Sequence, residues 1–180
     1  MAKIVTPEIK KIYRKLINQT IEDLNKPVVI HLEPIKVDCP NCLYDTLNKK
    51  SSGVFDTSFV APVVIFGDTI NPISFDRGRC PVCFGEGVLT SENTRNIKAL
   101  VKWNPGGTIE NIPIGREGAP LVRIKAKRTE YDHILSAEYF VVDGVRCEKV
   151  QPPTIRGLGT EEVLVTVLLV AVEPGSSVSS

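Results

Sequence analysis

The sequence contains two cysteine motifs, Cys39-Pro-Asn-Cys42 and Cys80-Pro-Val-Cys83-Phe-Gly85-Glu-Gly87, on which the organisation of the whole chain depends. Two Cys-Pro-x-Cys pairs far apart in sequence are the usual ligand set of a tetrahedral four-thiolate zinc site. A tight turn lets both sulfurs of a pair point at one ion. The glycines after Cys83 allow the backbone to pass close to the metal without a side-chain clash. We therefore predict a structural Zn2+ site with the ligands Cys39, Cys42, Cys80 and Cys83.

Other uses of these cysteines fit the pattern less well. A redox Cys-x-x-Cys motif usually opens a helix in a βαβ unit, whereas both pairs here lie among Pro, Gly, Asn and Ser. Catalytic zinc keeps an open position and often has a histidine ligand, but His31 and His133 are not adjacent to either pair. Two disulfides remain an alternative, although we expect a cytosolic chain whose thiols stay reduced, because the N-terminus has no signal-like apolar run.

The composition is that of an ordinary soluble protein. The chain has 180 residues, 42% of them hydrophobic, and a net charge of +1, so no basic excess marks a nucleic-acid binder. The longest apolar stretch, Val163 to Val172, contains Thr166 and is too short to cross a bilayer as a helix, so we expect no membrane partner. Cys147 lies in a strand-like stretch without a second thiol nearby, which favours a buried structural cysteine.

Residues 1–26 form an N-terminal segment with one predicted helix, over residues 6–25. Thr6 can cap this helix, Pro7 suits its first turn, and Pro27 lies just beyond its end. Apolar residues recur at the spacing of a single helix face, namely Ile9, Ile12, Tyr13, Leu16, Ile17, Ile21 and Leu24. We expect this face to cover either the chain's own β-domain or a neighbouring subunit.

Residues 27–36 and 91–174 are predicted to form the main domain, a small antiparallel β-barrel or sandwich, and residues 175–180 a flexible tail. Alternating apolar residues indicate strands at residues 27–33, 95–103 and 121–127. Asp143-Gly144 between two β-rich runs predicts a hairpin over residues 138–150. Residues 131–135 suggest a strand or turn, residues 151–159 a loop, and residues 161–173 a strand buried on both faces. The predicted fold class is therefore mainly β.

Residues 37–90 are predicted to form an inserted module that zinc holds together, comparable to a zinc ribbon. The segment is rich in Gly, Pro, Asn and Ser, and its apolar runs are short. Five apolar residues between the cysteine pairs suggest one small sheet: Phe55, Phe59, Val63, Ile65 and Phe66. Because so few apolar residues make a poor core, the metal would supply stability that burial cannot; zinc binding is worth about 10–16 kcal/mol in small finger peptides.

The strand at residues 121–127 places three basic side chains on one face, Arg123, Lys125 and Lys127, which we take as a candidate binding surface for an anionic partner. A long glycine-rich loop from Gly106 to Gly118 precedes it, and such loops are often functional. The sequence has no Ser/His/Asp set with supporting context and no phosphate-binding glycine loop between a strand and a helix. We therefore predict a binding or structural protein and not an enzyme.

The C-terminal half carries a recognisable order of elements: Asp132-His-Ile134, Glu138 to Arg146, Gly157-Leu-Gly159 and the apolar stretch Val163 to Val172. Over roughly residues 94–173 this order resembles the head-closure proteins of tailed bacteriophages, also called head–tail joining, connector or stopper proteins. In that family a strand with a D-x-I element leads into a hairpin, a variable loop follows, and a long apolar strand comes last. The usual members lack a zinc-binding insertion, so this chain departs from the family there.

The resemblance implies a small β-barrel that assembles into a homo-oligomeric ring of six or twelve copies in the virion neck. Such a protein is assembled in the host cytoplasm and located in the virion, with portal or adaptor proteins and tail proteins as partners. The ring would close the DNA exit channel, with the basic face of Arg123, Lys125 and Lys127 towards DNA or acidic partners. Long loops of such proteins reach neighbouring subunits or the channel, which would suit the Gly106–Gly118 loop, and the N-terminal helix would take part in self-association.

A different class of function stays open, a zinc-ribbon binding module for nucleic acid or for a protein client. The stretch Cys80 to Gly87 is similar to one repeat of the zinc domain of Hsp40-type co-chaperones. That domain needs four repeats, however, and Cys39-Pro-Asn-Cys42 is not followed by the expected glycines. A nucleic-acid-binding ribbon would carry a basic or aromatic stripe, whereas the basic residues between the pairs are few: Lys49, Lys50, Arg77 and Arg79. The structural interpretation is therefore favoured.

Overall fold

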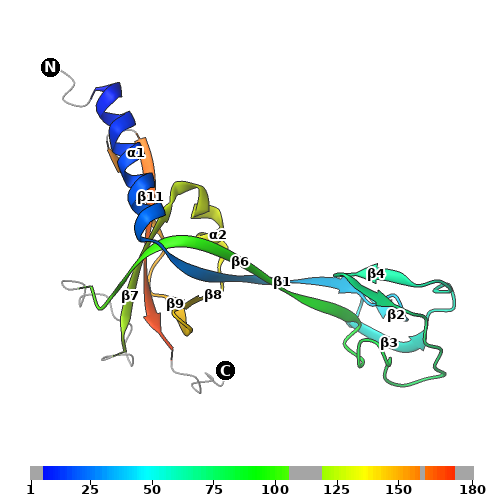
Figure 1. Cartoon of the computed structure of the whole chain (residues 1–180). Helices are drawn as coiled ribbons and strands as arrows, with labels where there is room; N and C mark the ends of the chain where they lie inside the picture. Colours follow the sequence, from blue (N-terminus) through cyan, green and yellow to red (C-terminus); the bar gives the residue numbers. More distant parts are fainter. Residues whose placement is uncertain (1–5, 106–118, 159–160, 173–180) are drawn as a thin grey trace. The chain divides into compact units, whose positions relative to one another are not determined.

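The computed structural model of the chain describes residues 6–105, 119–158 and 161–172 (Figure 1). It divides into two compact units: Met1–Glu33 with Thr94–Ser180, here called the main unit, and Pro34–Asn93, here called the cysteine unit. Two long strands, β1 (Lys26–Asp38) and β6 (Val88–Trp103), have residues in both units. The predicted Gly106–Gly118 loop and the predicted tail at residues 175–180 lie outside the described residues.

The main unit is built on a sheet of seven strands in the order β10-β11-β7-β6-β1-β8-β9. An additional pairing of β11 with β9 closes six of these strands into a ring of hydrogen-bonded neighbours. Besides β1 and β6, the strands are β7 (Leu121–Lys127), β8 (Tyr139–Val142), β9 (Val145–Lys149), β10 (Thr154–Leu158) and β11 (Glu161–Ala171). The prediction of a mainly β chain with an N-terminal helix is confirmed.

One hydrophobic core lies inside the main unit, where the apolar faces of these strands meet. Every second residue of β7 points inward, and these residues pack with the matching face of β11. The six residues are Val122, Ile124, Ala126, Val165, Val167 and Leu169. The opposite face of β11 is covered too, because Leu168 and Val170 pack with Leu121. β11 is thus buried on both faces, as its nearly unbroken apolar sequence predicts.

The predicted hairpin is present between β8 and β9. Asp143 and Gly144 have φ angles of 51° and 82°, the left-handed conformation that a two-residue type I′ turn requires. Across this hairpin Phe140 pairs with Cys147, and both side chains are fully buried. Cys147 is therefore a core residue, as expected, and burial raises the pKa of its thiol to about 11.

The chain between β7 and β8 is helical, and the prediction of a strand or turn at residues 131–135 is wrong. A 3-10 turn, η2 (Arg128–Glu130), leads into a short helix, α2 (Tyr131–Ser136). So short a helix shows no clear periodicity in sequence, and tertiary packing decides its conformation, here through the fully buried Ile134. The Asp132-His-Ile134 element, for which the sequence resemblance implied a strand, thus lies in a helix.

The segment after β9 contains the strand β10, and the prediction of a loop over residues 151–159 is wrong at this point. Thr154 pairs with Thr166 and Arg156 with Leu164, and the register shifts between Arg156 and Gly157. A bulge of this kind accommodates a glycine within a strand. The pairing with β11 is a tertiary contact that the local Pro and Gly content does not reveal.

The N-terminal helix α1 (Pro7–Leu24) forms as predicted, with Thr6 as its N-cap. Its apolar face is covered only in part. Ile21 is fully buried, but Ile12, Leu16 and Leu24 are 67%, 61% and 69% exposed. The helix contacts β7 and β11 of its own chain, and the described residues leave the rest of its apolar face exposed.

The cysteine unit consists of two small hairpins and the turns around the cysteine motifs. β2 (Cys42–Asp45) pairs with β3 (Lys50–Phe55), and β4 (Val63–Ile65) pairs with β5 (Asp68–Ile70). These are two separate two-stranded sheets, in place of the single small sheet that was expected. Each is too small to be stable alone, which makes the cysteine cluster the structural centre of the unit.

Candidate metal centre

The four predicted ligands come together in the cysteine unit. Their Sγ atoms all lie within 4.8 Å of one another, and none of them forms a disulfide. The Cys39 and Cys80 sulfurs are 3.9 Å apart, and the Cys42 and Cys83 sulfurs are 3.6 Å apart. Four thiolates at about 2.3 Å from a tetrahedral Zn2+ would be separated by about 3.8 Å. The observed spacing therefore fits a single tetrahedral ion.

The two motifs are also joined through their backbones. The Cys39 N–H donates to the carbonyl oxygen of Gly87 at 2.8 Å, so the start of the first motif is bonded to the end of the second. The Gly87 N–H donates to the Cys83 Sγ at 3.3 Å. A backbone N–H that points at the sulfur stabilises the thiolate, as expected around a metal ligand. The sequence Cys83-Phe-Gly-Glu-Gly87 thus serves both motifs.

Gly87 also lies directly against a neighbouring strand. Its φ angle is +80°, and a Cβ at this position would lie 2.3 Å from the backbone nitrogen of Ser51 and 2.6 Å from the carbonyl carbon of Lys50. The backbone at Gly87 thus approaches β3 closely, as well as the Cys83 sulfur. Because only glycine tolerates both the conformation and the contact, the second motif can lie directly against β3.

Asn41 is a supporting residue that the sequence analysis missed. It precedes Cys42 in the first motif, and its side chain is fully buried. The Asn41 amide donates to the carbonyl oxygen of Ile73 at 2.9 Å and to the Cys80 Sγ at 3.5 Å, and its Oδ1 accepts from the Ile73 N–H at 2.8 Å. Asn41 therefore ties a remote loop to both motifs. Its place between two ligand cysteines is the only signal in the sequence that could have suggested this role.

The thiols differ in how readily they lose a proton. Burial raises the pKa of Cys39 and raises the pKa of Cys42 to about 11. Burial also acts against the Cys80 thiolate, but hydrogen bonds from the Cys83 backbone and the Asn41 side chain outweigh it and lower the pKa of Cys80 to about 7. Four buried thiolates repel one another, so full deprotonation requires a bound cation.

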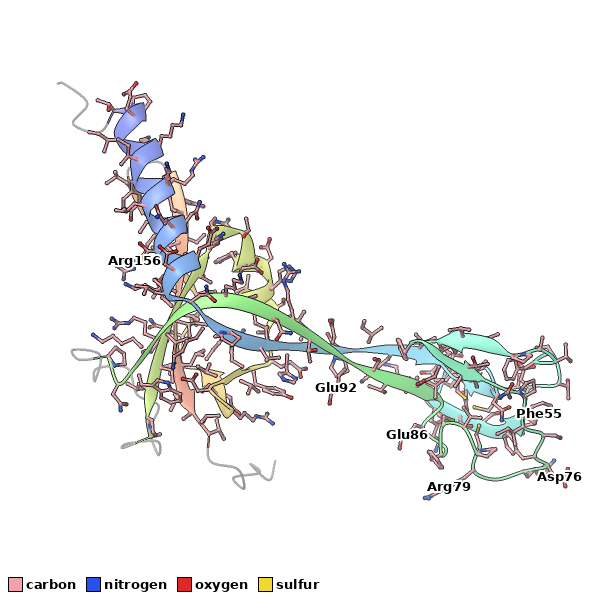
Figure 2. All side chains as sticks on the ribbon, viewed as in Figure 1. Phe55, Asp76, Arg79, Glu86, Glu92 and Arg156 are labelled. Atoms are coloured by element: carbon pink, nitrogen blue, oxygen red, sulfur yellow. The ribbon has the colours of Figure 1, made fainter. Side chains whose placement is uncertain are left out.

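The apolar core around the cysteines is small. The buried cysteines pack against three partly buried apolar residues, Phe75, Val82 and Leu89. Charged residues lie at the periphery of the unit, where Figure 2 labels Asp76, Arg79 and Glu86. A core of this size stabilises a module of about this length only weakly, so metal binding would contribute much of its folding free energy.

The three basic residues that were predicted to form one binding surface on β7 lie in two different environments. Lys127 is engaged with α1, because its Nζ lies 2.9 Å from the Glu22 Oε1. Arg123 and Lys125 instead line a small pocket together with Arg156 of β10. Arg156 was not predicted as a site residue because its segment, rich in Pro and Gly, has the sequence of a loop although it forms β10. Arg123 and Lys125 are thus brought together, while Lys127 is not part of the pocket.

Comparisons with known proteins add no assignment. No family model matches this chain, and neither a curated protein nor a solved structure matches it. Among the described residues, no helix is long and apolar enough to span a lipid bilayer. The inference of function therefore rests on the four-cysteine centre, the strands and the exposed surfaces.

Proposed function

We propose that this protein is a non-enzymatic structural protein of a tailed-phage neck, which forms a ring between the head and the tail and helps to close the DNA channel. The observation that carries the proposal is the uncovered apolar face of α1 beside a closed sheet. The resemblance to head-closure proteins supports it through the hairpin and the final buried strand, which the structure contains. The helical Asp132-His-Ile134 element is a departure from that family.

The apolar face of α1 is suited to contact between copies. Ile9, Ile12, Leu16 and Leu24 present exposed apolar side chains along one helix. Fully burying one such side chain is worth about 1.5–3 kcal/mol, so even partial burial of four side chains favours association. In a ring each subunit repeats the same contact, and a helix at the edge of one subunit covers the next. The apolar face of α1 would therefore be covered by a second copy of the chain.

The metal that we propose for the cysteine centre is Zn2+. All four donors are thiolates at tetrahedral spacing, which is the ligand set of closed structural zinc sites. Four protein ligands would fill the coordination sphere and leave no position for substrate. The ion would therefore hold the two motifs together and take no part in a reaction.

A second candidate function, protein binding by the cysteine unit, has an observation of its own in favour. Leu47, Val60 and Phe84 are 93%, 82% and 75% exposed on this unit. Residues 34–93 contain seven acidic and five basic residues, and zinc-bound thiolates would add further negative charge. Such a surface repels nucleic acid and suits an apolar protein partner. In the neck this partner would be a portal, adaptor or tail protein.

The assembly is tested by native mass spectrometry of the purified protein over a range of concentrations. We expect ring-sized oligomers that disappear in the double variant Ile12→Asn/Leu16→Asn. The control variant Lys11→Gln/Lys15→Gln changes neighbouring helix positions without removing an apolar side chain, and it should assemble normally. A strict monomer at every concentration, or equal loss of assembly in the two variants, would contradict self-association through α1.

The metal is tested in the same spectra. The wild-type chain should carry a mass increment of one zinc, and Cys80→Ser should lose it. In that variant residues 34–93 should become sensitive to protease while the main unit keeps its fold. The single tryptophan, Trp103, reports the main unit because its Nε1 donates to the Asp143 Oδ2 at 2.9 Å. A metal-free wild-type chain, or unchanged proteolysis of Cys80→Ser, would contradict the zinc proposal.

A further inference from the structure

A pocket of about 260 Å³ lies on the surface formed by β10, β11 and β7. Among its described lining residues three are cationic, Arg123 and Lys125 from β7 and Arg156 from β10, and none is acidic. Figure 2 labels Arg156 in the main unit. The volume is slightly below the roughly 300–1,000 Å³ of drug-sized ligand pockets, so the pocket suits a small anion or one charged group of a larger ligand.

The strand register explains how three cations meet at one place. Thr166 of β11 pairs with Lys125 on one side and with Thr154 on the other. Arg123 is two residues from Lys125 and lies opposite Leu168, and Arg156 is two residues from Thr154 and lies opposite Leu164. Both are therefore on the same face as Thr166, one on each side of it along β11. Opposite residues in adjacent strands are about 5 Å apart and next-nearest residues on one face about 7 Å. Long Arg and Lys side chains span such distances, so all three can reach one anion above Thr166.

The hydroxyl of Thr166 gives an independent sign of a missing partner. Its Oγ1 is out of contact with solvent and has no hydrogen-bond partner. The neighbouring Thr154 shows the usual arrangement, because its Oγ1 donates to the Thr166 carbonyl oxygen at 3.3 Å. Most buried hydroxyls in proteins are paired, so an unpaired one within a cationic pocket needs an explanation. An anionic oxygen in the pocket would accept its hydrogen bond.

A neighbouring lysine on β7 has a carboxylate partner, whereas the three cations of the pocket have none among the described residues. Lys127 is paired with Glu22 of α1, and this hydrogen bond is the largest cause that lowers the pKa of the Glu22 carboxyl. Arg123, by contrast, lies directly opposite Lys102 of β6, and like charges at opposite positions are destabilising. Within the described residues no carboxylate pairs with the three cations of the pocket. The pocket thus presents positive charge for which the described part of the chain supplies no carboxylate partner.

We propose that this pocket binds a phosphate group between Arg123, Lys125 and Arg156, with the Thr166 hydroxyl as a further donor. Arginine presents a planar fork of N–H groups that matches two phosphate oxygens, and lysine adds a compact charge. The group is either free phosphate or a phosphomonoester, or else a phosphodiester in a nucleic-acid backbone. The inference does not depend on the proposed place in a virion, and its test is independent of ring formation.

The test uses the full-length, metal-loaded protein and inorganic phosphate as the probe. Two-dimensional 1H–15N NMR spectra are recorded during a phosphate titration at constant ionic strength, with chloride as the balancing anion. We expect saturable shifts of the Thr154 and Thr166 amide signals. Arg123→Gln and Arg156→Gln should each weaken binding on the order of tenfold, because each removes a charge-assisted hydrogen bond. Lys127→Gln, on the same strand face but outside the pocket, is the control and should bind normally.

Thr166→Val removes the hydroxyl and keeps the shape of the side chain. It should keep the fold and bind phosphate several-fold more weakly. The absence of a saturable shift, an equal response to chloride, or an equal loss in Lys127→Gln would overturn the proposal.

A second arm replaces phosphate with a short DNA duplex. Binding that weakens in Arg123→Gln and Arg156→Gln but not in Lys127→Gln identifies the group as a backbone phosphodiester. If inorganic phosphate binds and the duplex does not, the group is free phosphate or a phosphomonoester. If neither probe binds, the pocket is not a phosphate site.

Discussion

Replacing Gly87 with alanine tests how the cysteine unit brings its two motifs together. The new Cβ would lie 2.3 Å from the Ser51 nitrogen and 2.6 Å from the Lys50 carbonyl carbon, at a φ angle of +80°. An L-residue in this conformation costs about 1–2 kcal/mol. Relieving the overlap with the β3 backbone costs about 1–3 kcal/mol more, the usual range for overpacking. We expect Gly87→Ala to destabilise the unit by about 2–5 kcal/mol.

Gly67 provides a matched control in the same unit. Its φ angle is +90°, but a Cβ at this position would meet nothing within 4 Å. Gly67→Ala should therefore carry only the conformational cost of about 1–2 kcal/mol. The difference between the two variants isolates the contact between Gly87 and β3 from the general cost of a left-handed alanine.

The assay is hydrogen–deuterium exchange of the metal-loaded protein, read by mass spectrometry on peptides from residues 34–93. Fluorescence is unsuitable because the single tryptophan, Trp103, belongs to the main unit. Since about 1.4 kcal/mol corresponds to a factor of ten, Gly87→Ala should accelerate exchange by roughly 30-fold to several thousand-fold, and Gly67→Ala by about tenfold. Peptides from β7 and β11 should not change. Equal effects of the two substitutions would refute the steric argument.

Three further predictions concern other parts of the chain. Asn41→Ala should destabilise the cysteine unit by about 1–3 kcal/mol, measured by hydrogen exchange in increasing denaturant, because it removes two hydrogen bonds that the fully buried Asn41 side chain makes to the Ile73 backbone. Hydrogen bonds from Lys26 and Trp103 lower the pKa of the Asp143 carboxyl below 3.8, so their contribution to stability is present above pH 3.8 and is lost as the pH falls through the lowered folded-state pKa. Melting temperatures followed by Trp103 fluorescence should show this loss, and Asp143→Asn should flatten the profile. Cys147, whose pKa burial raises to about 11, should resist alkylation by iodoacetamide until the main unit unfolds.

Each of these predictions has a result that contradicts it. Asn41→Ala with unchanged stability would mean that solvent replaces its buried hydrogen bonds. An unaltered acid profile in Asp143→Asn would show that other carboxyl groups dominate the loss of stability. Rapid alkylation of Cys147 in folded protein, measured by mass spectrometry of its peptide, would mean that the β8–β9 hairpin opens easily.

Several features followed from the sequence because their causes are local. Thr6 and Pro7 mark the start of α1, and Asp143-Gly144 specifies a turn whose conformation few other residue pairs adopt. The paired cysteines are a comparable case, since the chemistry of four thiols and their spacing predict a shared ion. Alternation of apolar residues located β6 and β7, and the long apolar run located β11.

The remaining features depend on contacts between residues that are distant in the chain. β10 forms because β11 offers it an edge, although its own sequence is rich in turn residues, and α2 forms around the buried Ile134. Only the folded chain shows that Asn41 joins the cysteine motifs, that Lys127 is paired with Glu22, and that Arg156 lines the same pocket as Arg123 and Lys125. Composition and local periodicity therefore determined which elements exist and which thiols share a site. The tertiary structure decided which polar groups are paired, because pairing depends on register and packing across the sheet.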